Sequence, residues 1–209
     1  MELLDHQTFD TFMIHSNVDP IMNITSGGIT ELLGPSSTGK TQICLYLSLQ
    51  VAWKNECEVW YIDTCNNFSS KRVLEIYRSL KEEASLEEEM KILSRIRVSR
   101  LFDPFELLNL SEQIDHFLAN GEYDNLKLIV IDSLSNVMST IIGGKQWIGH
   151  SMVVEIGRIL HHISHKYNIS ILCTNITLQE SNKPALGVGW MNLPSHRILL
   201  QPHPHNQSI

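Results

Sequence analysis

The fold of this chain follows from eight residues, Gly34-Pro35-Ser36-Ser37-Thr38-Gly39-Lys40-Thr41. They match the phosphate-binding pattern G-x-x-x-x-G-K-[ST] at every fixed position. The two glycines let the backbone turn tightly, so that its N–H groups point inward at a phosphate without a Cβ in the way. Lys40 supplies a positive charge for the β- and γ-phosphates, and the Thr41 hydroxyl is a ligand for the Mg²⁺ that accompanies them. The pattern therefore predicts a nucleotide-binding loop.

The residues on either side of this loop support that interpretation. Residues 28–33 before it are β-leaning, and residues 42–53 after it are apolar and free of Gly and Pro. The predicted order is strand, loop and helix, which is the context that a phosphate loop requires. The helix also adds its positive dipole end at the loop. A coincidental Gly/Ser turn is the alternative, and the flanking residues disfavour it.

Composition and charge narrow the class of protein. The chain has 209 residues, 43% of them hydrophobic and 19% charged, which suits one compact domain with a sizeable core. Its formal net charge of -7 argues against a broadly basic nucleic-acid-binding surface. Its four cysteines form no C-x-x-C pair and fit a reduced, intracellular compartment. The sequence shows neither a secretory signal nor an apolar run of membrane-spanning length.

A second strong signal is the run Leu126-Lys127-Leu128-Ile129-Val130-Ile131-Asp132-Ser133. Consecutive bulky apolar residues are typical of a central parallel strand that is buried on both faces. The run ends in Asp132, which places a carboxylate at the carboxyl edge of the sheet, where it can hold Mg²⁺ through water. Thr41 and Asp132 are therefore the predicted metal-binding residues. A strand-terminal Asp without a metal role is the alternative.

The rest of the chain alternates strands and helices. We expect further strands at 58–63, 95–98, 169–175 and 197–200, and helices at 69–81, 104–118 and 151–167. The acidic segment 82–89 is interpreted as a solvated helix end or a loop, and residues 139–150 and 178–194 are interpreted as loops. The pattern predicts an α/β fold with a doubly wound, mostly parallel sheet that binds ligands at the carboxyl ends of its strands.

Two shorter segments flank the predicted core at residues 27–200. Residues 1–26 carry an isolated apolar cluster, and we interpret them as an edge segment packed on the domain or as an arm that docks on a partner. Residues 201–209 are polar and contain proline, and we expect them to be disordered.

Taken together, the motifs resemble the ATPase core of the RecA/RadA strand-exchange recombinases. The resemblance rests on the phosphate loop, Tyr61-Ile62-Asp63-Thr64, the run ending in Asp132, and Thr174-Asn175, in matching order over about residues 27–200. Residues 95–108 and 183–190 are most similar to the D-paralogue branch of the eukaryotic recombinases. The resemblance implies a P-loop NTPase of RecA type, truncated at both ends relative to the family. It also implies binding of ATP with Mg²⁺, and a nuclear role in homologous-recombination repair beside other recombinase paralogues.

Two departures from the family pattern concern hydrolysis of ATP. The resemblance places a water-orienting glutamate at Cys65 and a γ-phosphate-sensing glutamine at Ile176. A thiol is a poor proton acceptor near neutral pH, and an aliphatic side chain cannot donate a hydrogen bond to a phosphate. No catalytic residue is therefore assigned with certainty, and we expect a chain that binds ATP but hydrolyses it slowly, if at all.

The resemblance also aligns residues 139–150 and 178–194 with two DNA-facing loops. The candidate contacts to single-stranded or branched DNA, through phosphates and base stacking, are Lys145, Trp147, Lys183 and Trp190. Ordinary surface loops or partner contacts are the alternative, which the scarcity of cations and the negative net charge favour.

Three functions stay open at this point. The first is an ATP-binding subunit of a recombinase-paralogue complex with weak or no hydrolysis. The second is an active DNA-dependent ATPase with strand-exchange activity, and Cys65 and Ile176 distinguish it from the first. The third is a small-molecule kinase on the same loop, which normally needs an arginine-rich lid that the sequence does not show.

Overall fold

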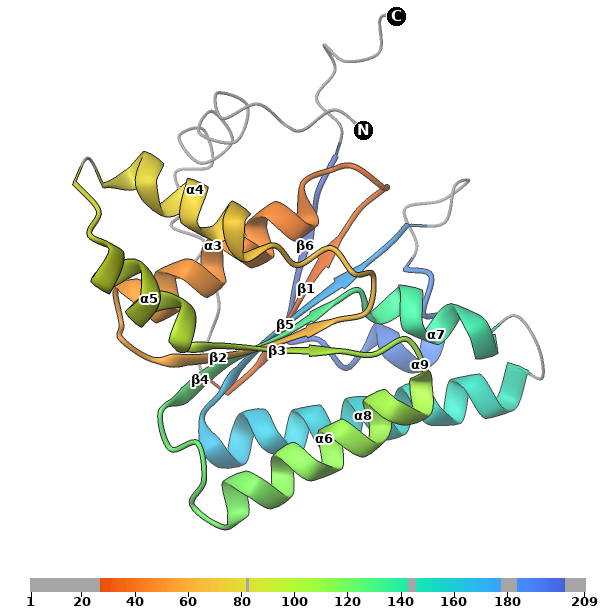
Figure 1. The fold of residues 1–209 in the computed structure, drawn as a ribbon. Coiled ribbons are helices and arrows are strands. Elements are labelled where there is room, and N and C mark those ends of the chain that lie inside the picture. Colours follow the sequence, from red (N-terminus) through yellow and green to blue (C-terminus); the bar gives the residue numbers. More distant parts are fainter. Residues whose placement is uncertain (1–26, 82, 143–145, 178–183, 202–209) are drawn as a thin grey trace, which may run out of the picture.

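In the part of the chain that the structure describes, the strands pair in parallel into one six-stranded sheet with the order β3-β2-β4-β5-β1-β6 (Figure 1). The structure is a computed structural model that describes residues 27–81, 83–142, 146–177 and 184–201. The strands are β1 (Ile29–Leu33), β2 (Glu58–Asp63), β3 (Ile96–Arg100), β4 (Leu126–Asp132), β5 (Ser170–Asn175) and β6 (His196–Leu199). The predicted α/β class with a parallel sheet is confirmed. Of the two predicted flanking segments, residues 1–26 and all of 201–209 except Gln201 lie outside the described residues.

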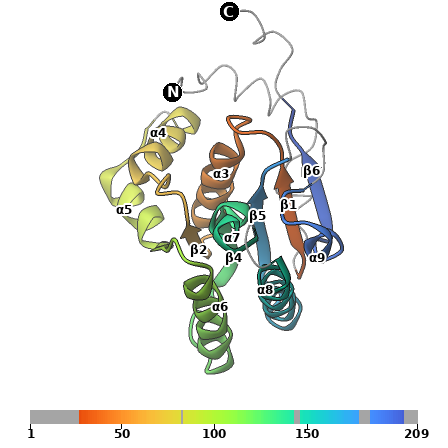
Figure 2. The ribbon, with the colours of Figure 1, turned by 90° about the vertical axis from the view of Figure 1, so that its right-hand side faces the viewer.

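Helices cover both faces of the sheet. One face carries α3 (Lys40–Trp53), α4 (Ser70–Leu80) and α5 (Leu86–Ser94), and the other carries α6 (Pro104–Ala119), α7 (Leu134–Ile142) and α8 (Gln146–Tyr167). Figure 2 shows the two helical layers on either side of the strands, with the short α9 (Val188–Met191) beside β6 and α8. Among these helices, none is both long and apolar enough to cross a membrane.

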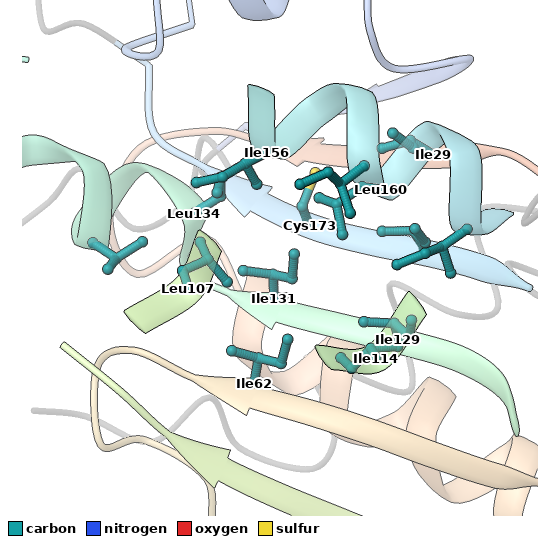
Figure 3. Close-up of a cluster of buried hydrophobic side chains, with 14 of the residues drawn as sticks. Ile29, Ile62, Leu107, Ile114, Ile129, Ile131, Leu134, Ile156, Leu160 and Cys173 are labelled. Atoms are coloured by element: carbon teal, nitrogen blue, oxygen red, sulfur yellow. The ribbon is translucent and has the colours of Figure 1, made fainter. Parts of the chain in front are cut away.

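Side chains along each strand alternate between two hydrophobic layers. Ile29, Ile131 and Cys173 point toward α6 and α8, as Figure 3 shows, whereas Val130 and Leu172 belong to the layer under α3 and α4. Because both faces of these strands are buried, polar and apolar residues do not alternate in their sequences, and the central strands are continuous apolar runs. This property is why the sequence alone predicts β4.

The acidic segment 82–89 contributes to a capped helix. Ser85 is the N-cap of α5, and its hydroxyl accepts from the Glu88 N–H while the Glu88 carboxylate accepts from the Ser85 N–H. Glu89 is buried and forms two hydrogen bonds with Arg78 of α4. Carboxylates in a first helical turn also meet the positive end of the helix dipole. Of the two interpretations given to this segment, the helix end is therefore correct for residues 86–89 and the loop is not, and Glu89 is buried instead of solvated.

Helices also occupy most of residues 139–150, which were predicted to form a loop. Helix α7 continues to Ile142, and α8 begins at Gln146 instead of at the expected Ser151. Leu134, Val137 and Met138 are buried at helical spacing, and this apolar face holds α7 against the sheet. The Gly-Gly-Lys sequence that suggested a loop falls at residues 143–145, which lie outside the described residues.

Candidate nucleotide site

The phosphate loop connects β1 to α3 at the carboxyl edge of the sheet. Gly39 has φ 85° and caps α3, which begins at Lys40. A Cβ at Gly34 would lie 2.5 Å from the carbonyl oxygen of Leu200, so only glycine fits at the start of the loop. The strand, the loop and the helix predicted from the sequence are all confirmed, and α3 begins directly after the loop. The first N–H groups of an α-helix have no partner within the helix, so a helix start suits an anion.

The Lys40 ammonium lies inside this loop. Its Nζ donates to the carbonyl oxygens of Gly34 at 2.8 Å and Pro35 at 2.6 Å, and it lies 3.4 Å from Thr38 Oγ1. Partial burial lowers the pKa of Lys40, and the nearby Asp132 carboxylate acts in the opposite direction. A desolvated ammonium held mainly by neutral carbonyls gains stabilisation from a bound anion, which is the property that a phosphate site needs.

The Asp132 carboxylate accepts hydrogen bonds from three hydroxyl groups, which come from three different elements. Thr41 Oγ1 donates to Asp132 Oδ2 at 2.8 Å, Tyr61 Oη donates to the same oxygen at 3.0 Å, and Thr174 Oγ1 donates to Oδ1 at 2.7 Å. The strand order explains the convergence, because β5 lies between β1 and β4, and β2 pairs with β4 on the other side. The carboxyl ends of all four strands therefore meet at this carboxylate.

The donor set at this point fits Mg²⁺. The Thr41 hydroxyl and the Asp132 carboxylate are hard oxygen ligands within 2.8 Å of each other, and Mg²⁺ is usually held by one or two such groups together with phosphate oxygens and water. Thr41 and Asp132 are the residues that would hold the ion. When bound, Mg²⁺ would neutralise phosphate charge beside the loop.

Cys65 lies in a short loop that Asp63 organises. The buried Asp63 carboxylate accepts from the backbone N–H groups of Cys65, Asn67 and Phe68 at 3.0–3.1 Å. Desolvation raises the pKa of the Cys65 thiol, and a contact with the Thr64 hydroxyl opposes this only in part. The thiol is therefore protonated near neutral pH and is a poor proton acceptor.

Thr64 fixes this loop next to the end of β4. Its hydroxyl donates to the Ser133 carbonyl oxygen at 2.8 Å and accepts from the Ser133 N–H at 2.8 Å. The Asn136 side chain donates to the Thr64 carbonyl oxygen at 3.0 Å. Cys65 consequently occupies a defined position at the same edge of the sheet as Asp132.

The end of β5 lies directly beside the loop. Asn175 accepts from the Gly34 N–H through its backbone carbonyl at 3.3 Å. The next residue, Ile176, has 40% of its surface exposed, and its N–H donates to the Asn175 side chain at 2.8 Å. An aliphatic side chain therefore follows β5 where the resemblance expects an amide.

The structure corrects one predicted DNA contact. Trp190 is 0% exposed, and its indole N–H donates to Glu31 at 2.8 Å, so its ring has no free face on which a base could stack. Trp147 falls in the first turn of α8, but its side chain is not among those described. Lys145 and Lys183 lie outside the described residues.

A cavity of about 190 Å³ lies at the opposite edge of the sheet. Its lining comes from the amino ends of β2, β3 and β4 and includes Trp60, Arg97 and Tyr123. Ligands of open parallel sheets bind at the carboxyl ends of the strands, so the phosphate loop and not this cavity is the candidate nucleotide site.

Sequence reasoning missed three residues that organise this edge. Tyr61 and Thr174 were noted only as parts of motifs, although both hydroxyls bind Asp132. Glu31 received no role, although it is the only charged residue of β1 and is fully buried. A lone carboxylate in the sequence of a buried strand indicates that other polar side chains lie around it, because buried charges require partners.

A parallel sheet with a phosphate loop after β1, a carboxylate at the end of β4 and β5 inserted between them defines a P-loop NTPase domain of RecA type. Comparison with known sequences makes the assignment specific. The Rad51 family profile matches residues 15–189, and the chain belongs to this family. Proteins of the Rad51 family generally bind ATP.

Individual relatives agree with the family assignment. The chain is 34% identical over 219 residues to a probable DNA repair protein RAD51 homolog 4 of Dictyostelium discoideum, covering 87% of this chain and 62% of that protein. It is 30% identical over 182 residues to DNA repair protein RAD51 homolog 4 of Bos taurus, covering 84% and 55%. It is 27% identical over 175 residues to DNA repair and recombination protein RadB of Thermococcus sibiricus, covering 81% and 69%. The chain thus spans 55% to 62% of the length of these two RAD51 homolog 4 proteins.

Proposed function

We propose that this chain binds Mg·ATP at residues 34–41 and acts as an ATP-binding subunit of a recombinase-paralogue complex in homologous-recombination repair. The observation that carries the proposal is the contact between the Thr41 hydroxyl and the Asp132 carboxylate at 2.8 Å, next to a complete phosphate loop. Similarity to proteins named RAD51 homolog 4 supports the role in repair, and a nuclear location follows from that role.

Slow hydrolysis is the second part of the proposal. The position that the family resemblance assigns to the water-orienting carboxylate holds Cys65, a thiol whose pKa burial raises. No proton acceptor is therefore supplied at this position near neutral pH. Ile176 in place of an amide removes a hydrogen-bond donor to the terminal phosphate. The alternative, an active strand-exchange ATPase, requires another side chain to take over the role of the carboxylate.

Equilibrium binding of a fluorescent ATP analogue in the presence of Mg²⁺ tests the nucleotide site. We expect Lys40→Ala to weaken binding at least about 10-fold, since a charge-assisted contact to phosphate is worth roughly 1.5–3 kcal/mol. Lys127→Ala is the matched control, because Lys127 is exposed near the amino end of β4, away from the loop. Equal affinity of the wild type and the Lys40 variant would remove the nucleotide site from the proposal.

The same preparations decide between binding and turnover. Steady-state hydrolysis as fast as that of a strand-exchange recombinase, abolished by Lys40→Ala, would favour the active-ATPase alternative.

Affinity purification from nuclei with and without ATP tests the partners. We expect recombinase paralogues to copurify with the wild type in an ATP-dependent manner and to be reduced with Lys40→Ala. Recovery that is independent of both nucleotide and Lys40 would show that ATP does not control assembly.

Direct DNA contact is proposed for Lys145, Trp147 and Lys183 only. Each lysine that neutralises a phosphate of single-stranded DNA contributes about 0.7 to the slope of log affinity against log salt. We therefore expect Lys145→Ala with Lys183→Ala to reduce this slope by about 1.4 in fluorescence anisotropy. The control is Lys71→Ala with Lys127→Ala, which removes the same charge from exposed sites. An unchanged slope would remove the two lysines from the DNA interface.

A further inference from the structure

Helix α6 carries a buried carboxylate oxygen, Asp115 Oδ1, that has no hydrogen-bond partner among the described residues. The Asp115 side chain as a whole is 34% exposed, so the burial affects this oxygen and not the whole group. An ionised oxygen that is removed from water and left unpaired costs free energy. A hydrogen-bond donor or a cation at this oxygen would therefore stabilise the folded chain.

An imidazole of the neighbouring helix faces this oxygen. His162 of α8 places its Nε2 3.5 Å from Asp115 Oδ1, and α6 and α8 pack together on the same face of the sheet (Figure 2). This distance is beyond the range of about 2.7–3.2 Å for good N–H···O hydrogen bonds. It agrees with two ligand atoms of one tetrahedral ion, which lie about 3.3–3.5 Å apart when each bond is about 2.0–2.2 Å long. Nitrogen together with oxygen is a donor set of Zn²⁺, whereas Mg²⁺ and Ca²⁺ take oxygen ligands.

Tyr167, the last residue of α8, positions both groups. Its hydroxyl donates to the backbone carbonyl oxygen of Asp115 at 3.3 Å, which holds the end of α8 against α6. Its ring lies edge-on to the His162 ring, with centroids 6.5 Å apart and an interplanar angle of 87°. Residues that orient the ligands from outside are a regular part of metal sites in proteins. The two candidate ligands therefore stand on two packed helices, and a third side chain fixes them there.

A second pair of histidines lies on the solvent-facing side of α8. His161 and His165 are four residues apart, and their ring centroids are 4.2 Å apart. Both are exposed and belong to one helix, so an ion there would compensate no buried charge and would join no second element. No third His, Cys, Asp or Glu completes a larger group of ligands in the described part of the chain. The unpaired oxygen is the observation that selects Asp115 and His162.

We propose that Asp115 Oδ1 and His162 Nε2 bind a zinc ion that clamps α6 to α8. Water completes the four-coordinate shell, because no larger group of ligands is present in the described residues. The ion places a positive charge beside the buried oxygen and joins two helices of the same hydrophobic layer. Both residues lie in the C-terminal halves of their helices, which lead into the amino ends of β4 and β5, at the opposite edge of the sheet from the phosphate loop (Figure 1). The site therefore does not require a bound nucleotide.

Isothermal titration of the chelator-treated full chain with ZnCl₂ tests the site. We expect the affinity of the tightest zinc site to fall at least about 10-fold in His162→Gln and in Asp115→Asn, since changes even outside the ligand shell usually cost about 10–100-fold. His165→Gln and Glu112→Gln are the matched controls, because they remove the same groups from exposed positions on α8 and α6. Both controls should retain the zinc affinity of the wild type. Equal zinc affinity of all four variants would overturn the proposal.

Co²⁺ in place of Zn²⁺ gives a readout on the wild type alone, which stands even if a variant does not fold. A tetrahedral Co²⁺ site absorbs visible light strongly, whereas a six-coordinate site absorbs it weakly. We expect an intense visible band that Zn²⁺ abolishes, together with a Tm that rises with zinc concentration.

Two other results would each overturn the metal site. Zinc affinity that is lost in His165→Gln and kept in His162→Gln would place the ion on His161 and His165. A wild-type Tm that zinc does not change would show that the only cation at Asp115 is a proton on His162. Neither result bears on nucleotide binding, which is measured separately.

Discussion

Cys65 is the residue on which the proposed separation of nucleotide binding from hydrolysis rests. Its backbone N–H is held by Asp63, and its neighbour Thr64 is held by Ser133, so the side chain is placed beside the carboxyl end of β4. This position does not make the thiol a general base, because burial raises its pKa and keeps it protonated near neutral pH. A carboxylate at the same place would be ionised at neutral pH.

Restoring that carboxylate should restore turnover. We expect Cys65→Glu to raise the rate of ATP hydrolysis about 10²-fold or more, the usual lower range for a positioned general base. The measurement is phosphate release at saturating Mg·ATP, with nucleotide affinity determined in parallel. Cys57→Glu, a second partly exposed cysteine just before β2, is the control and should leave the rate unchanged. A wild-type rate equal to that of the Cys65→Glu variant would contradict the role assigned to the thiol.

Helix α5 depends on local capping more than on its few buried side chains. The Ser85 hydroxyl and the Glu88 carboxylate satisfy each other's backbone N–H groups at 3.2 Å, while only Glu89 and Ile92 of the helix are buried. Ser85→Ala should lower the free energy of unfolding by about 1 kcal/mol, as other N-cap deletions do. Ser94→Ala at the opposite end is the control, and urea denaturation measures both. Equal effects of the two variants would show that the cap is not what holds α5.

Glu88 makes the stability of the packed helices α4 and α5 depend on pH in a predictable way. Hydrogen bonds from Lys81, and then from the Ser85 backbone, lower the pKa of Glu88 to about 2. A lowered carboxyl pKa stabilises the fold above the ordinary value of 4.5, and this contribution is lost as pH falls toward about 2. The Tm difference between the wild type and Glu88→Gln should therefore be present at pH 6 and shrink toward pH 2. Glu87→Gln, an exposed neighbour, is the control. If the Tm difference between the wild type and Glu88→Gln stays constant with pH, the interaction of the Glu88 carboxylate with Lys81 is not its source.

At the scale of the whole molecule, the candidate nucleotide site combines residues from separate parts of the sheet. The loop after β1, Asp132 of β4 and Thr174 of β5 are joined only in the folded state. A ligand that binds this edge therefore stabilises the whole parallel sheet, since the unfolded chain has no such site. Thermal unfolding should reflect this linkage.

We expect Mg·ATP at 100 times its dissociation constant to stabilise the wild type by about 2.7 kcal/mol. The increase in Tm should grow with ligand concentration and should be smaller for Lys40→Ala at the same concentrations, since a 10-fold weaker affinity leaves only about 1.4 kcal/mol of stabilisation. Mg²⁺ alone and Lys127→Ala with Mg·ATP are the controls. A Tm that does not depend on ATP concentration would contradict nucleotide binding to the folded state.

Much of the fold could be predicted because its signals are local. Residues 34–41 form a contiguous motif, and β4 is a continuous apolar run that ends in Asp132. The start of α8 and the whole of α7 are harder to predict from the sequence. Gly143-Gly144-Lys145 interrupts the helical pattern, and the burial of Leu134 and Met138 depends on the sheet beneath them. Their helical structure is fixed by packing more than by propensity.

By itself, the sequence determined which groups are the candidates for holding a phosphate and a magnesium ion, and that the chain alternates strands and helices. It also determined that a thiol and an aliphatic side chain replace two groups that the family resemblance associates with hydrolysis. Only the tertiary structure decided that Tyr61 and Thr174 converge on Asp132, and that Glu31 binds Asn175 and Trp190. Strand order and burial set those contacts, and both arise from packing between residues far apart in the chain, which no local pattern of residue types records.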